Sequence, residues 1–220
     1  MYPYDISLDQ VNGNIYVVDS GNNRIQIFNE KFEFIESIGR KGTNNGEFNC
    51  PSRIAFDEQQ QRMYVVDQNN HRVQVFEKRG NEHQFLKCIG RCDGKEGTGK
   101  GEFRYPRSVC IDEDGLIYVS DFGNHRIQIF NNENGECIGM IGSEGTKKGE
   151  FKCPTGITVD EFGNIFVCDT NNHRIQVFYL KQQKRILSLQ RMCLRMIRKE
   201  KIEIPNEISH ILERVYGFYL

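Results

Sequence analysis

The chain has 220 residues, of which 38% are hydrophobic and 27% charged, a balance typical of a soluble globular protein rather than a disordered one. Its formal net charge of -1 provides no overall attraction to nucleic acid or anionic lipid, although opposite charges can still gather on opposite faces. No apolar run approaches the ~20 residues that span a bilayer, and the first residues lack the basic and apolar regions of a secretory signal.

The eight cysteines include no Cys-x-x-Cys pair, and most lie in strand-like segments or before prolines. We therefore expect reduced thiols in a cytoplasmic protein. Cys88 and Cys92 are close enough in sequence to share a metal or to oxidise, but a single short pair without neighbouring histidines is weak evidence for either.

One segment occurs four times along the chain. It reads NIYVVDSGNNRIQIF at 14–28, RMYVVDQNNHRVQVF at 62–76, LIYVSDFGNHRIQIF at 116–130 and NIFVCDTNNHRIQVF at 164–178. Its aspartates follow one another at intervals of 48, 54 and 48 residues. Such a period indicates a repeat architecture.

Each repeat carries the same predicted elements in the same order. A proline precedes a short alternating strand that ends in Asp, and a tight turn leads to a second strand that also ends in Asp. An Asn- and Gly-rich turn, an Arg-Ile/Val-Gln strand and a weaker strand ending in Ile-Gly follow. Four short strands per unit of this length match one blade of a β-propeller, in which each blade is buried against its neighbours.

Two short motifs resemble those of NHL repeats. They are Asn-His-Arg-Ile/Val at 70–73, 124–127 and 172–175 (Asn-Arg-Ile at 23–25), and Gly-Glu-Phe at 46–48, 101–103 and 149–151. The resemblance covers about residues 2 to 180. It implies an all-β, NHL-type β-propeller of four four-stranded blades over residues 1–180, with blades at about 2–39, 50–90, 105–142 and 153–190.

Propellers of that family typically have six blades, and this chain supplies four. A closed four-bladed ring, an arc completed by a partner, and a fragment of a longer product all remain open, and we favour the last. Because an open arc exposes strand edges, we also expect association through the open blade edges.

The loops are predicted to divide by charge between two faces. The inter-blade connections, at about 40–53, 91–107 and 143–154, hold eleven cations against six anions. The first turns of the blades hold eight carboxylates against Arg62 alone. Solvated loop charge is the alternative explanation, but loops on a rigid scaffold are where binding is usually found. We call the eleven cations the basic loop face and predict that they bind the partner: Arg40, Lys41, Arg53, Arg91, Lys95, Lys100, Arg104, Arg107, Lys147, Lys148 and Lys152.

The residues that recur in every blade are predicted to be structural. Asp closes one strand and Arg opens the next, so the two can pair across the turn. These pairs are Asp19 with Arg24, Asp67 with Arg72, Asp121 with Arg126, and Asp169 with Arg174. The recurring histidines at 71, 125 and 173 invite a metal site, but equivalent turns of neighbouring blades lie too far apart to share one ion.

The sequence supplies no catalytic, metal-binding or cofactor-binding motif that we accept. Residues 94–101 approach a phosphate-binding loop, but Gly101 stands where Ser or Thr is needed and no helix follows. A propeller lyase or hydrolase is therefore the least favoured function.

The last 40 residues follow a different pattern. Residues 181–201 hold eight cations and one anion, which predicts a basic helix that covers the acidic edge or binds a partner. Pro205 then begins an amphipathic pattern that resembles the opening of an F-box, although a helix docked on the propeller explains it as well. We expect a short helical tail over 181–220.

The resemblance implies a non-enzymatic interaction module or scaffold, without a cofactor, that binds a protein partner through its loop faces in a ubiquitin-ligase or RNA-regulatory context. The RING, B-box and coiled coil of such ligases are not in this sequence, so ligase activity is not assigned to it. RNA binding through the basic loop face is the alternative.

Overall fold

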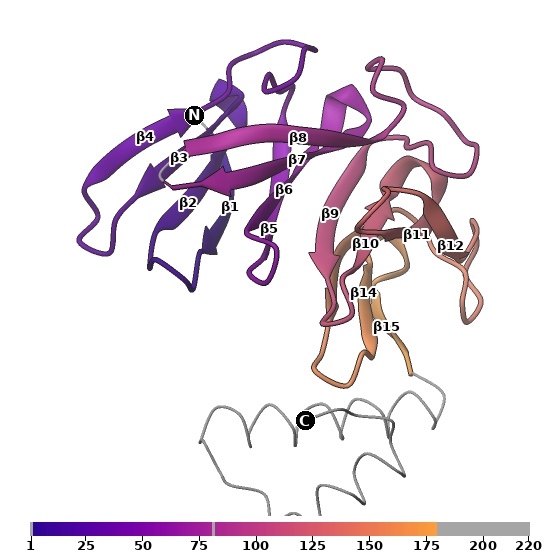
Figure 1. Cartoon of the computed structure of the whole chain (residues 1–220). Helices are drawn as coiled ribbons and strands as arrows, with labels where there is room; N and C mark the ends of the chain where they lie inside the picture. The colour runs from indigo at the N-terminus through magenta and orange to yellow at the C-terminus, as the bar shows by residue number, and fades with distance from the viewer. Residues whose placement is uncertain (1, 81, 180–220) are drawn as a thin grey trace, which may run out of the picture.

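The computed structural model describes residues 2–80 and 82–179 of the chain. They form four consecutive antiparallel sheets, which we number as blades 1 to 4 (Figure 1). The expected basic and amphipathic helices of the tail, and the expected fourth strand of the last blade, lie outside the described residues.

Within each blade the strands pair in chain order, so every blade is an up-and-down meander. Blade 1 contains β1 (Pro3–Leu8), β2 (Ile15–Asp19), β3 (Arg24–Phe28) and β4 (Phe34–Ile38). Blade 2 contains β5 (Pro51–Asp57), β6 (Arg62–Asp67), β7 (Arg72–Arg79) and β8 (Glu82–Gly90). Blade 3 contains β9 (Pro106–Ile111), β10 (Leu116–Asp121), β11 (Arg126–Asn131) and β12 (Cys137–Ile141). The described part of blade 4 contains β13 (Pro154–Val159), β14 (Ile165–Asp169) and β15 (Arg174–Phe178).

A 3₁₀ turn joins the second and third strands of each blade: η1 (Ser20–Asn22), η2 (Gln68–Asn70), η3 (Phe122–Asn124) and η4 (Thr170–Asn172). The next residue is left-handed in all four blades, Asn23 in the first and His71, His125 and His173 in the others. Asn and His are among the non-glycine residues found most often in this conformation, which accounts for their recurrence at this position. Among the described residues, no helix is long and apolar enough to cross a membrane.

The core consists of three clusters, each lying between two consecutive blades. Strand alternation places one set of side chains on each face of a blade, and the two inner blades bury both sets. The phenylalanine of each Gly-Glu-Phe motif (Phe48, Phe103, Phe151) is fully buried in one of these clusters. The connection between two blades therefore belongs to the core as much as the strands do.

The four blades form an open arc. The first strands of successive blades contact one another in the order β1–β5, β5–β9 and β9–β13. Figure 1 shows blade 1 and blade 4 at opposite ends of this series, so the four described blades do not close into a ring.

Candidate functional site

The recurring aspartate of each blade is the centre of a hydrogen-bond network. Asp67 accepts from Asn70, from the Arg72 Nε at 2.8 Å and from Gln74. The equivalent ion pairs measure 2.9 Å between Asp19 and Arg24, 2.8 Å between Asp121 and Arg126 and 2.7 Å between Asp169 and Arg174. These side chains are therefore committed to the scaffold.

Burial and hydrogen bonding compete in setting the pKa of these carboxyl groups. Burial raises the pKa of Asp67 and Asp121, which are both fully buried. Burial also opposes ionisation of Asp19 and Asp169, but the hydrogen bonds that reach them outweigh it and lower their pKa.

The arginine and glutamine of the network also hold the preceding inter-blade loop. In blade 2, Arg72 donates to the carbonyl oxygens of Asn44 and Glu47 at 2.8 and 3.0 Å. Gln74 donates to the Glu47 carbonyl at 2.7 Å and accepts from the Gly46 N–H at 2.9 Å. Blades 3 and 4 repeat these contacts with the loops that precede them.

The glutamate of each Gly-Glu-Phe motif caps its own loop. The Glu47 carboxylate accepts the Asn44 N–H, and the Asn44 N–H and Arg40 together lower its pKa. In the glycine-rich loop of blade 3, Glu102 accepts the Gly99 N–H at 2.9 Å. A Cβ at position 97 would overlap this carboxylate, so the glycine there makes room for the chain's own anion.

The recurring histidines accept hydrogen bonds from the next blade. The Tyr105 N–H donates to His71 Nδ1 at 3.1 Å, and the Cys153 N–H donates to His125 Nδ1 at 3.0 Å. In blade 1 the Asn23 side chain accepts the Cys50 N–H in the same way. Within residues 2–80 and 82–179, no group of three or more His, Cys, Asp or Glu is placed to hold a metal ion.

The structure divides the basic loop face into paired arginines and unpaired lysines. Arg40 pairs with Glu47, Arg91 with Asp93 and Glu102, and Arg104 with Glu96. Six exposed lysines form no ion pair in the described part of the chain, although hydrogen bonding from Arg91 lowers the pKa of Asp93 and the neighbouring Lys95 lowers it further. They are Lys41, Lys95, Lys100, Lys147, Lys148 and Lys152.

Arg53 and Arg107 belong to strands rather than to loops. Arg53 lies on β5 and pairs with Asp5 of β1 at 3.1 Å. Arg107 lies on β9, donates to the Tyr4 hydroxyl at 2.7 Å, and its guanidinium carbon lies 4.6 Å from the Phe122 ring centroid. Both side chains link blades. The cations of the basic loop face that form no ion pair within the described residues are therefore the six lysines and Arg107.

The acidic first turns are less available than a charge count suggests. Asp9 is buried and forms an ion pair with Lys78 at 3.0 Å, and Asp57 is buried and accepts from Asn132 at 2.7 Å. Asp112 accepts backbone N–H groups of its own turn and the Tyr118 hydroxyl. Many of these carboxylates therefore stabilise their own turns or link neighbouring blades, and the sequence did not predict the contacts between blades.

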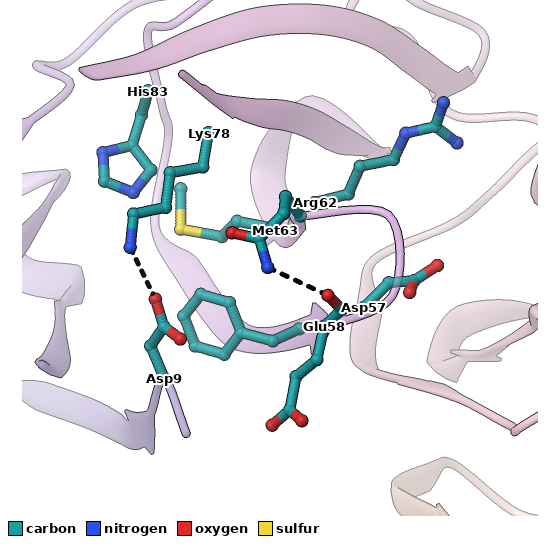
Figure 2. Close-up of a pocket in the computed structure, with 9 residues that line it drawn as sticks. Asp9, Asp57, Glu58, Arg62, Met63, Lys78 and His83 are labelled. Atoms are coloured by element: carbon teal, nitrogen blue, oxygen red, sulfur yellow. Dashed lines mark hydrogen bonds and ion pairs between the residues drawn. The ribbon is translucent and has the colours of Figure 1, made fainter. Parts of the chain in front are cut away.

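A small pocket lies between the first turns of blades 1 and 2, with Asp9, Lys78 and His83 on one side and Arg62 and Met63 beside them (Figure 2). The His83 side chain is 3.0 Å from the Tyr16 hydroxyl and 3.3 Å from Glu36. Burial lowers the pKa of His83 and raises that of Tyr16, so both groups stay neutral near pH 7. The cavity measures about 10 Å³, which is the lower limit for one water molecule and far too small for a substrate.

The expectation of reduced thiols is wrong for one pair of cysteines. Cys88, near the end of β8, forms a disulfide with Cys92, four residues further on. The chain bends at Gly90, the last residue of β8, where φ is +111°, and Gly90 lies between the two cysteines. Five other described cysteines are free, and burial raises the pKa of the Cys110 thiol to about 12.

Comparison with protein families and known proteins agrees with this geometry. The NHL repeat model matches residues 103–130 and 151–178, and a model described as a 6-bladed beta-propeller matches residues 5–70. NHL repeat-containing protein 3 of Homo sapiens is 46% identical over 46 residues, which are 21% of this chain and 13% of that protein. Protein lin-41 of Caenorhabditis elegans is 45% identical over 40 residues, which are 18% of this chain and 4% of that protein.

Solved structures show the same fold at low identity. An auxiliary nutrient binding protein from Bacteroides thetaiotaomicron superposes with a TM-score of 0.65 and 16% identity, over 80% of this chain and 47% of that one. A streptogramin B lyase superposes with a TM-score of 0.55 and 14% identity, over 81% of this chain and 55% of that one. The chain thus spans about half of these structures and a small part of the curated relatives. The four blades, the repeated network and the matches to the repeat model together show that the chain carries NHL repeats in an all-β propeller arrangement.

Proposed function

We propose that this chain is a non-enzymatic interaction module whose basic loop face binds an acidic segment of a protein partner. The observation that carries the proposal is the set of six exposed lysines that form no ion pair in the described part of the chain. The anions of the same loops are occupied: Glu47, Glu102 and Glu150 accept N–H groups of their own loops. Arg40, Arg91 and Arg104 pair with four of the six loop anions, and the lysines therefore carry positive charge that no ion pair among the described residues compensates.

The rigidity of the loops supports binding rather than simple solvation. Each loop is fixed at its Gly-Glu-Phe segment, by its buried phenylalanine and by hydrogen bonds from the arginine and glutamine of the next blade. Lysines on such a loop are positioned relative to one another before a partner arrives, which lowers the entropy lost on binding. Because surface charges chiefly accelerate association and set its salt dependence, those are the quantities to measure.

The test compares two double charge reversals in the full chain. Lys95→Glu with Lys100→Glu changes the basic loop face. Lys31→Glu with Arg79→Glu makes the same change of charge at the turns between the third and fourth strands of blades 1 and 2, which lie at the opposite ends of the strands from the inter-blade loops. Affinity for a fluorescent Glu-rich peptide is measured by anisotropy at rising salt. We expect the first variant to weaken binding at least tenfold and the second to leave it nearly unchanged.

The same titration with single-stranded RNA addresses the alternative function. Phosphate contacts by lysine would give RNA binding a steep dependence on salt. If RNA binds more tightly than the acidic peptide and loses affinity in the Lys95 and Lys100 variant, then the RNA-binding function replaces the proposal. Equal affinity of both variants for the peptide would contradict protein binding through this face.

A cytoplasmic location and a ubiquitin-ligase context stay predictions. The Cys88–Cys92 disulfide favours a less reducing compartment, because glutathione and thioredoxin keep such pairs reduced in the cytosol. Cell fractionation of the full-length protein, together with thiol trapping of this pair, tests the location directly.

A further inference from the structure

Every blade presents two apolar faces, a leading face toward the preceding blade and a trailing face toward the next. The trailing face of blade 1 (Tyr16, Val18, Ile25 and Ile27) packs on the leading face of blade 2 (Ile54, Met63, Val65 and Phe76). The same positions of the repeat meet between blades 2 and 3 and between blades 3 and 4. The structure thus contains three copies of one interface.

The leading face of blade 1 has apolar residues at the equivalent positions, but no blade of the described residues packs against it. Ile6 is 68% exposed, whereas its equivalents Ile54, Val109 and Ile157 are 2%, 2% and 4% exposed. Leu8 on the same face is 56% exposed. An apolar face of this kind usually marks an interaction site.

The polar groups beside this face also lack their usual partners. Arg24 and Gln26 both donate to Asp19, but neither reaches a loop carbonyl in the described part of the chain, whereas the equivalent side chains of the other blades do. Blade 1 therefore keeps donors available next to its exposed apolar residues.

The trailing face of blade 4 is the complementary end. Ile175 is 67% exposed, whereas its equivalents Ile25, Val73 and Ile127 are fully buried. Cys168, which pairs across the strands with Ile175, is exposed as well. The exposed His173 occupies the position from which His71 and His125 accept an N–H of the next blade.

We propose that the chain associates head to tail, with the trailing face of blade 4 of one copy seated on the leading face of blade 1 of a second copy. The contact would place Phe166, Cys168, Ile175 and Val177 against Ile6, Val17 and Phe28, which reproduces the pairing of positions found between consecutive blades. Because the two faces differ, the contact is heterologous: it produces either a closed ring or an open chain of copies with one face of each kind free at its ends. The sequence alone predicted association through the edges of the open blades, whereas the head-to-tail contact lies on the faces of blades 1 and 4 instead.

The test is sedimentation velocity of the full chain over a wide range of concentration. We expect the weight-average mass of the wild type to rise above the monomer mass of 25.6 kDa as concentration increases. Ile6→Lys removes the leading contact and Ile175→Lys removes the trailing contact, so each variant alone should stay monomeric. Both side chains are about two-thirds exposed, so neither substitution disturbs the core. Circular dichroism verifies the fold, and Leu8→Lys serves as a second variant of the leading face.

A mixture of the two variants separates head-to-tail contact from any other. The Ile6 variant keeps its trailing face and the Ile175 variant keeps its leading face, so an equal mixture should form a dimer and nothing larger. Ile138→Lys, on the outer strand β12 and 51% exposed, is the matched control and should associate like the wild type. A monomeric wild type at all concentrations would overturn the proposal. So would association of either variant alone, which would indicate a symmetric contact or a different surface.

Discussion

Four arginines occupy one position of the repeat but differ in burial. The side chains of Arg72, Arg126, Arg174 and Arg24 are 1%, 12%, 31% and 36% exposed. All four donate to the aspartate of their blade, but Arg24 donates to no loop carbonyl within the described residues. Replacement by methionine keeps an unbranched apolar stem and removes the guanidinium group. The series therefore varies the environment of one interaction while its chemistry stays constant.

Arg72→Met should have the largest effect. It leaves the fully buried Asp67 without its cation, removes the Arg72 donor from the Asn44 carbonyl, and leaves the Glu47 carbonyl with Gln74 as its side-chain donor. Breaking a buried ion pair costs about 3–5 kcal/mol of unfolding free energy, whereas an exposed pair contributes about 0–1 kcal/mol. We therefore expect a loss of about 3–5 kcal/mol for Arg72→Met and at most about 1 kcal/mol for Arg24→Met.

The loss should also depend on pH in a known direction. Burial already raises the pKa of Asp67, and removal of Arg72 raises it further. A carboxyl group whose folded-state pKa lies above its unfolded value destabilises the fold above that pKa, and protonation relieves the effect. The deficit of Arg72→Met should therefore be full at neutral pH and shrink as pH falls through the folded-state pKa of Asp67.

Urea unfolding of the full chain, followed by circular dichroism, measures these differences. The midpoint should fall far more for Arg72→Met than for Arg24→Met at an unchanged m-value, with Arg126→Met between them. If Arg72→Met unfolds the chain completely, then the Arg126 variant still tests the order. Equal losses in the Arg72 and Arg24 variants would refute the link between loop contacts, burial and stability.

Three further substitutions or treatments probe other parts of the repeat. Burial lowers the pKa of His71, so the unfolded state binds a proton at a higher pH than the folded state does, and the wild type should lose stability as pH falls below about 6.5. His71→Asn should keep an acceptor for the Tyr105 N–H but lose this pH dependence. If urea unfolding shows the same loss of stability on acidification for the wild type and the variant, then this reasoning is wrong. Gly42→Ala should destabilise the fold by about 1–3 kcal/mol because its Cβ would overlap the Glu47 carboxylate. In a double variant with Glu47→Ala the clash is absent, so the loss measured by thermal melting should be smaller than the sum of the two separate losses; a strictly additive loss would argue against the clash. Alkylation before reduction should spare Cys88 and Cys92, and labelling of either by peptide mass spectrometry would exclude the disulfide.

The parts of the fold that could be predicted from sequence are those that depend on local order. The period of the repeat gave the blades, and the alternation within each unit gave the strands. The pairing of Asp67 with Arg72 could be expected because both flank one short turn. Each of these inferences needs only a few consecutive residues, and none needs to know how two blades pack.

The contacts between blades could not be predicted in the same way. Arg72 reaches the Asn44 carbonyl, 28 residues earlier, and Lys78 reaches Asp9, 69 residues earlier. A signal for the first existed, since Arg-x-Gln begins 24 or 25 residues after the glutamate of Gly-Glu-Phe in blades 2, 3 and 4, but its meaning requires the geometry of the stack. The second is specific to blade 2, where the longer strands β7 and β8 carry Lys78 to the first turn of blade 1.

The division between repeated and unrepeated residues explains where interactions remain available. The residues of the repeat are occupied where a neighbouring blade is present: Asp67 by its arginine, Gln74 by the preceding loop, and His71 by the Tyr105 N–H of the following loop. Two kinds of group escape this requirement. The loop lysines have no such partner in the described part of the chain because they are not part of the repeat. The outer faces of blades 1 and 4 have none because the blade that would complete the repeated interface is not among the described residues. The loop lysines differ in number and position from loop to loop and suit a specific partner. The outer blade faces keep the sequence of the repeat and suit another blade of the same kind.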